Sequence, residues 1–215
     1  YDTELEDLET KLKTALIDAE EKGLILSKRR YSVVESFEKG LIQKVRQLGM
    51  GKATVQIRLE STGNLSTTGK DAIDILFDAN GSSNLVPLRE SASGGEVSRL
   101  MLALKSILAA NDQTPTLIFD EIDTGVSGEV AKQIGALMKE ISGSTQILAV
   151  THLPGVAAKG KNHFKIQKFE EKEEVVSRLE QLSDDERVKE IAAMFSGHKL
   201  TDAALESARN LLHEN

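Results

Sequence analysis

Residues 2–48 carry apolar positions that are separated by alternating steps of three and four residues. The segment contains no Pro and is dense in Glu, Lys and Leu. A 3.5-residue repeat is typical of a coiled-coil seam, so the pattern predicts a long helix that buries one stripe against a partner helix. Leu41, Val45 and Leu48 continue an apolar helical face beyond an expected irregularity near Gly40. The seam positions, two of them basic, are Leu5, Leu8, Leu12, Ala15, Ala19, Lys22, Leu26, Arg29 and Val33.

This pattern predicts a coiled-coil stub over residues 1–48, followed by a separate domain over 49–215. A helix of this length would extend for about 70 Å, which is too long to lie flat on a small domain. A second interpretation stays open, in which two ordinary amphipathic helices are broken near Gly23. In either case the apolar stripe needs a partner.

From Thr54 the spacing of apolar residues changes to two, which is typical of a half-buried strand. We expect a strand over 54–59, a polar loop over 61–70 and a second strand over 72–77. Helices and buried strands then alternate, which predicts an α/β domain with a largely parallel sheet flanked by helices. The expected helices are 96–110, 128–141, 184–195 and 202–213, and the expected strands are 116–119, 146–150, 163–168 and 175–182.

Composition narrows the functional classes. The chain has no Cys, which excludes disulfides, thiol catalysis and a Cys-ligated metal. No apolar run approaches the roughly 20 residues of a membrane-spanning helix, so we expect no membrane partner. The net charge of −7 gives little support to strong DNA binding by this segment, because broad DNA-binding faces are usually basic. Tyr1 to Glu4 include no start Met, and we expect them to lie inside a longer protein.

Two adjacent acids follow an apolar strand that we expect to be buried on both faces. Asp120 and Glu121 come directly after residues 116–119, and ligands of open α/β sheets bind at the carboxyl ends of strands. In that position Asp120 could hold Mg²⁺, while Glu121 could orient and deprotonate a water that attacks a phosphoryl group. The alternative is a strand that ends in two solvated acids.

A glycine pair opens the helix that precedes this strand. Ser93, Gly94, Gly95 and Glu96 stand in sequence at the expected helix start. Backbone N–H groups of glycines approach an anion closely, and a helix N-terminus adds partial positive charge. A helix-start turn with Ser93 as its N-cap is the alternative.

Two further motifs lie at the expected sheet edge. His152 follows the strand over 146–150 and could contact a terminal phosphate, although a single His is often structural. Asp123 begins a turn with two glycines that leads to Ser127 and the next helix. The alternative for this turn is a simple strand-to-helix loop with Ser127 as the cap.

The order of these four motifs resembles that of the ATP-binding-cassette (ABC) ATPases, with a signature motif, a Walker B strand, a D-loop and a switch histidine. The strings over 92–105, 119–128 and 151–158 resemble the signature helix, the Walker B strand with its D-loop, and the switch region of the RecN family of bacterial DNA-repair proteins. Leu48-Gly49-Met50 resembles the junction where the RecN coiled coil re-enters its head. The resemblance covers nearly the whole chain.

This resemblance implies an α/β fold: the carboxy-terminal lobe of an ABC/SMC-type P-loop ATPase head with an amino-terminal, descending coiled-coil helix. It implies a DNA double-strand-break repair ATPase that binds ATP and Mg²⁺ between two dimerised heads. The implied site residues are Glu121 and His152 in catalysis, Asp120 on Mg²⁺, Ser93, Gly94, Gly95 and Glu96 facing the ATP of the opposing head, Asp123 across the dimer, and Ser127 with the nucleotide-binding residues.

The phosphate-cradling Walker A loop is not found in this sequence. The nearest string, Gly63 to Asp71, has one residue too many between its glycines and places Asp where a hydroxyl is required. The resemblance places Walker A in an amino-terminal lobe, so we expect this chain to hold half of a site and to be inactive alone. The implied partners are that lobe, an ascending coiled-coil strand, a second identical head and, for the full-length protein, DNA. The implied location is the bacterial cytoplasm, at the nucleoid.

Three alternatives stay open on the residues alone. Another SMC-class chromosome protein would share all four motifs. The nucleotide-binding subunit of a membrane transporter would share them too, but the long amino-terminal helix argues against it. A non-enzymatic coiled-coil scaffold or adaptor would carry the motifs by accident.

Overall fold

The computed structural model describes residues 2–90, 94–108, 114–120, 122–171, 174–197 and 200–213. The chain divides into two compact units. The first joins Tyr1–Lys44 with Lys52–Ala92, and the second joins Val45–Gly51 with Ser93–Asn215. This division differs from the predicted boundary after residue 48, because the strands that follow the long helix belong to the helix's own unit.

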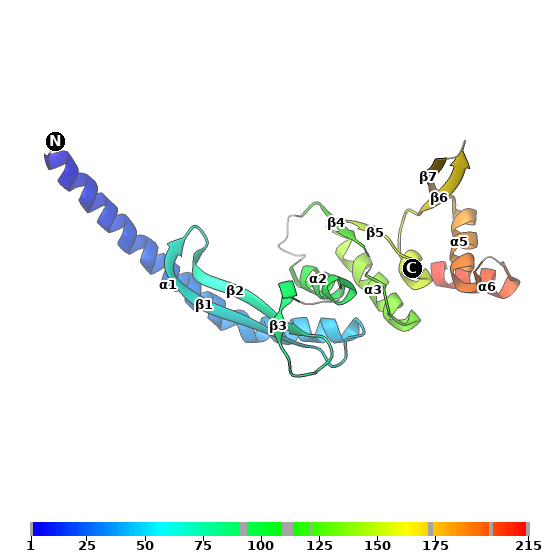
Figure 1. Ribbon diagram of the computed structural model, residues 1–215, viewed down its shortest axis with the longest axis horizontal. Coiled ribbons are helices and arrows are strands. Elements are labelled where there is room, and N and C mark those ends of the chain that lie inside the picture. The colour runs from blue at the N-terminus through cyan, green and yellow to red at the C-terminus, as the bar shows by residue number, and fades with distance from the viewer. Residues whose placement is uncertain are drawn as a thin grey trace. The chain divides into compact units, whose positions relative to one another are not determined.

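The first unit contains most of one long helix, α1 (Asp2–Gln47), which continues through both Gly23 and Gly40 (Figure 1). The alternative with two helices broken near Gly23 is therefore wrong. Three exposed ion pairs at i,i+4 spacing join Asp7 to Lys11, Asp18 to Lys22 and Glu35 to Lys39. Fully exposed pairs of this kind contribute little to the stability of a helix, because solvent screens them, so α1 needs tertiary contacts as well.

An antiparallel sheet supplies those contacts. Its strands are β1 (Thr54–Ser66), β2 (Gly69–Asp78) and β3 (Val86–Pro87), in the order β1-β2-β3, and a short 3₁₀ helix, η1 (Leu88–Glu90), follows. The predicted loop over 61–70 is wrong, since the strands continue to a tight turn between Ser66 and Gly69. β1 is polar and exposed near this turn, and a register shift between Ser61 and Ser66 breaks the alternation.

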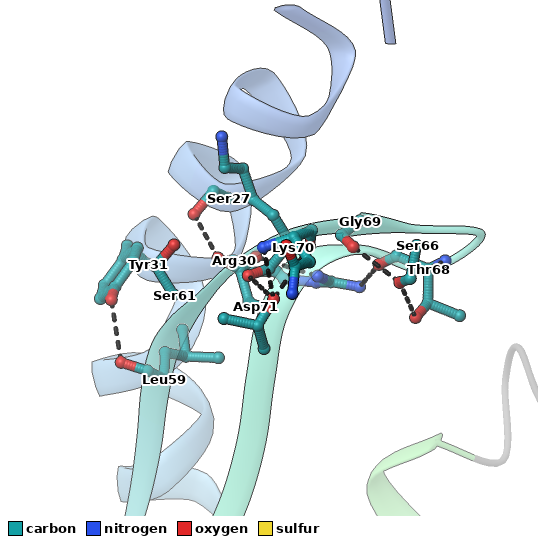
Figure 2. A network of polar contacts seen from close by, with 12 residues as sticks. Ser27, Arg30, Tyr31, Leu59, Ser61, Ser66, Thr68, Gly69, Lys70 and Asp71 are labelled. Atoms are coloured by element: carbon teal, nitrogen blue, oxygen red, sulfur yellow. Dashed lines mark hydrogen bonds and ion pairs between the residues drawn. The ribbon is translucent and has the colours of Figure 1, made fainter. Parts of the chain in front are cut away.

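The β1–β2 hairpin lies along α1, as Figure 2 shows for its tip. The Asp71 carboxylate accepts hydrogen bonds from Ser27 Oγ (2.6 Å) and Arg30 Nη1 (2.9 Å), and its side chain is 1% exposed. Arg30 also donates to the Thr68 carbonyl (2.8 Å). The bonds from Ser27 and then Arg30 hold the pKa of Asp71 below its ordinary value. The carboxylate is therefore the charged anchor of the hairpin tip.

Gly23 lies where the hairpin approaches the helix backbone. A Cβ at this position would stand 3.0 Å from Leu65 Cδ1, whereas a Cβ at Gly40 would meet nothing within 4 Å. Farther along, Tyr31 Oη donates to the Leu59 carbonyl (2.9 Å). The glycine that suggested a helix break is thus a site of close packing between the hairpin and α1.

The predicted seam is exposed at the start of α1. Leu5, Leu8 and Leu12 are 60%, 63% and 62% exposed. No segment in the described part of this chain covers these leucines. An apolar stripe that is exposed in this way is typically buried against another helix.

The second unit alternates helices and strands. Its elements are α2 (Gly94–Leu108), β4 (Thr116–Phe119), α3 (Gly128–Ile141), β5 (Gln146–Ala149), α4 (Pro154–Ala157), β6 (Phe164–Glu171), β7 (Glu174–Gln181), α5 (Asp184–Ser196) and α6 (Asp202–His213). The predicted helices and strands are present here within a few residues, although positions 109 and 110 of the first predicted helix lie outside the described residues. The sequence patterns missed β3, η1 and the four-residue α4.

Strand pairing follows the length of each connection. β4 and β5 are parallel and are joined across α3, whereas β6 and β7 form an antiparallel hairpin. The α/β fold is confirmed, but the expectation of a largely parallel sheet holds for β4 and β5 alone among the described strands. The other pairs are antiparallel because short turns cannot connect parallel neighbours.

The second unit buries one side of α3 and one side of β4. Buried side chains of α3 recur at Ala131, Ile134, Met138 and Ile141, the spacing of one helical face. The prediction that residues 116–119 are buried on both faces is wrong, since Phe119 is 7% exposed and Ile118 is 70% exposed. Neighbouring residues of a strand point to opposite faces, and the described part of the chain covers only one of them. Among the described helices, none is long and apolar enough to cross a membrane.

The two glycines of α1 give a matched test of hairpin docking. Gly40→Ala should raise the free energy of unfolding by about 0.5–1 kcal/mol, because Ala is the better helix former and its Cβ meets open space. Gly23→Ala should gain less, and Gly23→Leu should destabilise, because the added atoms crowd Leu65. Urea unfolding followed by circular dichroism measures each change. Equal gains for the two alanine variants would contradict the packing at Gly23.

Candidate functional site

Asp120 and His152 lie at the same edge of the second unit's parallel strands. Phe119 pairs with Ala149 at the end of the β4–β5 ladder, and Val150 N donates to the Phe119 carbonyl (2.9 Å). Asp120 directly follows β4, and His152 lies two residues beyond Val150. Both side chains are exposed, as residues that meet a ligand must be. Glu121, the second acid of the pair, lies outside the described residues.

The turn after this edge ends in a helix cap. Gly125 has φ +71°, a backbone conformation that favours glycine. Ser127 is the N-cap of α3, and its side chain accepts a hydrogen bond from Val130 N (3.5 Å). The structure thus places Ser127 in the capping position that was the alternative to a nucleotide contact.

Asp123 in the same turn has a buried side chain. It is 2% exposed, and its Oδ2 accepts hydrogen bonds from Thr151 Oγ1 and from His152 N (3.0 Å). The Nδ1 atom of His152 lies 3.4 Å from the same oxygen, while the His152 side chain itself is 70% exposed. The carboxylate is thus occupied within its own lobe, and it is not exposed for the predicted contact across a dimer.

A buried arginine reaches the same turn from α2. Arg99 is 8% exposed, and its Nη1 donates to the carbonyls of Thr124 (3.2 Å) and Ile122 (3.5 Å). Burial lowers the pKa of the Arg99 guanidinium, although a guanidinium stays charged in proteins. Arg99 and Thr151 were not predicted as site residues. The available signal for Arg99 was its place directly before the apolar run that includes the buried Leu100, Leu102 and Ala103.

The glycine pair begins α2. Gly94 is the first helical residue and is exposed, and Gly95 and Glu96 are half-buried. A helix N-terminus carries partial positive charge and N–H groups without partners inside the helix. The predicted anion-binding turn therefore lies at the surface of the second unit, and Ser93 lies outside the described residues.

A Mg²⁺ ion would find one ligand here. Within the described ranges, no group of three or more His, Asp or Glu residues could hold a metal ion. Mg²⁺ in phosphate-binding sites commonly uses one or two carboxylates, with substrate phosphates and water completing the shell. The exposed Asp120 carboxylate fits that requirement as a single ligand.

The rejected Walker A string has a structural role. Lys70 Nζ contacts Glu20 Oε2 (2.8 Å), and Asp71 is bound by Ser27 and Arg30 (Figure 2). Both side chains anchor the hairpin to α1 in the first unit. These contacts agree with the prediction that the string from Gly63 to Asp71 is not a Walker A loop.

Sequence comparison identifies relatives over most of the chain. No family model matches. The DNA repair protein RecN of Rickettsia conorii is 40% identical over 188 residues, which is 87% of this chain and 34% of that protein. RecN of Halalkalibacterium halodurans is 34% identical over 215 residues (98% and 38%), and RecN of Deinococcus radiodurans is 37% identical over 190 residues (88% and 33%). The predicted resemblance to RecN is confirmed. The chain spans about a third of the length of these RecN relatives.

Solved structures support the fold. A Smc head domain with a coiled coil and joint from Pyrococcus yayanosii matches 91% of this chain and 37% of its own, with a TM-score of 0.56 at 22% identity. A Smc head domain with an extended coiled coil from Pyrococcus furiosus, bound to the C-terminal domain of ScpA, matches 86% of this chain and 46% of its own (TM-score 0.52, 20% identity). The RecN-like chain therefore has the fold of part of an SMC head.

Substitutions at Ser127 measure how much its capping hydrogen bond stabilises α3 when no nucleotide is bound. Ser127→Ala should lower the free energy of unfolding by about 0.5–2 kcal/mol, because α3 loses its N-cap. Ser127→Asp should restore most of that loss, because a carboxylate also accepts from the first helical turn. Thermal or urea unfolding measures both. Wild-type stability of Ser127→Ala would show that the 3.5 Å contact contributes nothing.

Proposed function

We propose that this chain is the carboxy-terminal half of the ATP-hydrolysing head of a RecN-type DNA-repair protein. The observation that carries the proposal is the placement of Asp120 and His152 at one carboxyl edge of the parallel β4–β5 pair. Relatives that are 34–40% identical are named DNA repair proteins, which supports the same biological role.

Asp120 and His152 at this edge, and Glu121, which follows Asp120 in the sequence, each have a chemical task in the proposal. Glu121 orients a water molecule and removes its proton as the water attacks the terminal phosphorus of ATP. His152 donates a hydrogen bond to the terminal phosphate. Asp120 is a ligand of Mg²⁺, which when bound neutralises charge on the phosphates. Together these groups stabilise the charge that shifts during phosphoryl transfer.

The glycine turn serves the opposing head in this proposal. Ser93 and the N–H groups of Gly94 and Gly95 contact the ATP that a second, identical head holds. The exposed start of α2 supports this arrangement, because a contact between two molecules requires a surface position. Glu96 follows in the same turn.

Two apolar surfaces support the remaining partners. Ile118 is 70% exposed on β4, and Leu148 and Val150 are 47% and 57% exposed on and beside β5. Such a surface suits an amino-terminal lobe of the same protein that carries the Walker A loop. The exposed leucines at the start of α1 suit the ascending strand of a coiled coil. DNA would be bound by the complete protein, since this segment has a net charge of −7.

Removing the proposed base tests the chemistry. In the complete protein, Glu121→Gln should slow ATP hydrolysis by about 10²–10⁴-fold, the usual contribution of a general base. ATP binding should persist, because the substitution keeps the side chain's size. Glu206→Gln, an exposed position on α6, is the matched control and should hydrolyse ATP at the wild-type rate. Phosphate release and a fluorescent ATP analogue report the two quantities. Wild-type turnover in Glu121→Gln would assign the base elsewhere.

The division of the site between two lobes has its own test. This chain alone should hydrolyse ATP no faster than background, because it has no Walker A loop to hold the nucleotide. Supplying the amino-terminal lobe as a separate chain should restore turnover and ATP-dependent dimerisation, read by light scattering. Full turnover from pure carboxy-terminal chain would contradict the proposal, and no dimerisation with both lobes present would favour a non-enzymatic scaffold.

A further inference from the structure

The buried carboxylate of Asp123 connects two segments that are far apart in the sequence. Thr151 and His152 follow β5, 28 and 29 residues after Asp123. Both donate to one atom, Oδ2, through the Thr151 hydroxyl and the His152 backbone N–H. A buried carboxylate is stable only when its lost hydration is replaced by hydrogen bonds. The carboxylate and the 151–152 segment therefore hold each other in place.

Thr151 completes a local turn around the histidine. Its Oγ1 donates to Asp123 and accepts from Leu153 N (3.1 Å), so one hydroxyl bridges the carboxylate to the residue after His152. The backbone on both sides of His152 is thereby tied to Asp123. The His152 side chain remains exposed, with its Nδ1 on the side of the carboxylate.

Arg99 fixes the other side of the connection. Its Nη1 donates to the carbonyls of Ile122 and Thr124, the residues on either side of Asp123. Arg99 Nε is buried and has no hydrogen-bond partner within the described ranges, so the hydrogen bonds of this guanidinium to the turn are those of Nη1. Arg99 belongs to α2, the helix that begins with the Gly94 turn. A continuous set of polar contacts thus runs from α2 through Asp123 to His152.

We propose that Asp123 and Arg99 are positioning residues that set the location of His152 relative to α2. This inference rests on the proposed ATPase function and adds residues that act through His152. Asp123 holds the histidine backbone, and Arg99 holds the turn that carries Asp123. A displacement of about 1 Å in a catalytic group costs up to about 10²-fold in rate, so these contacts matter even though both side chains are buried.

The decisive experiment removes one hydroxyl in the complete protein. Thr151→Val keeps the shape of the side chain but loses the bonds to Asp123 and to Leu153 N. We expect kcat for ATP hydrolysis to fall by about 10–100-fold with KM for ATP changed by less than about threefold, because position and not ground-state binding is lost. Thr151→Ser keeps the hydroxyl and should recover most of the loss. Equal rates for the valine and wild-type proteins would overturn the inference.

A second measurement separates positioning from general damage. In a His152→Ala background, Thr151→Val and Asp123→Ala should cause less than about a twofold further loss of kcat, because residues that act through one group are not additive. Arg99→Met should behave in the same way. The same fold-loss in both backgrounds would mean that these residues act on stability or on another part of the site, and the inference would fail.

Hydrogen exchange provides a readout that does not depend on turnover. In the complete protein, mass spectrometry of the peptide containing residues 150–154 should show faster amide exchange in Thr151→Val and Asp123→Ala. The His152 and Leu153 N–H groups lose their acceptors in one or both variants. Unchanged exchange would overturn the positioning role. If instead wild type shows no ATP hydrolysis, or Glu121→Gln keeps it, the proposed function fails while the exchange result still decides the contact.

Discussion

Parallel strands cannot be joined by a tight turn, and this constraint organises the second unit. The chain must cross from the end of β4 to the start of β5, and α3 makes that crossing. The crossing brings the carboxyl ends of β4 and β5 together, so Asp120 and His152 share an edge although they are 32 residues apart. The four-residue ladder from Thr116–Gln146 to Phe119–Ala149 is therefore the interaction on which the candidate site depends.

Buried charge makes this edge specific. Asp123 and Arg99 lie in the interior, where an unpaired charge is costly, and each is held by hydrogen bonds to a neighbouring segment. Apolar packing alone would tolerate small shifts between α2, the turn after β4 and the residues after β5. Hydrogen bonds tolerate only smaller shifts between these segments, because their lengths are fixed. The polar contacts thus fix the backbone around His152, while the buried face of α3 contributes apolar packing.

The first unit joins a helix and a hairpin by a similar combination. Asp71 is bound by Ser27 and Arg30 at the hairpin tip, and Gly23 allows the hairpin to approach the helix closely. The hairpin contacts begin near Glu20, and the leucines before that point remain exposed. The apolar seam of α1 is thus available to a partner helix over its first turns. Beyond Glu20, the β1–β2 hairpin covers part of the surface of α1.

The sequence alone determined the helical character of residues 2–48 and the α/β fold of the second unit, because hydrophobic periodicity follows secondary structure, and its residue types determined the order of the motifs. It also predicted that Asp120 and His152 would share an edge, because the β-α-β connection leaves little choice of topology. Periodicity reports which side chains are apolar, but not which surface will cover them. Gly23 therefore suggested a break where the hairpin packs, and residues 61–70 suggested a loop because exposed strands do not alternate. Only tertiary structure decided that Ile118 is exposed and that Asp123 is buried against Thr151. Those outcomes depend on segments that meet across long stretches of chain, and no local pattern records such a meeting.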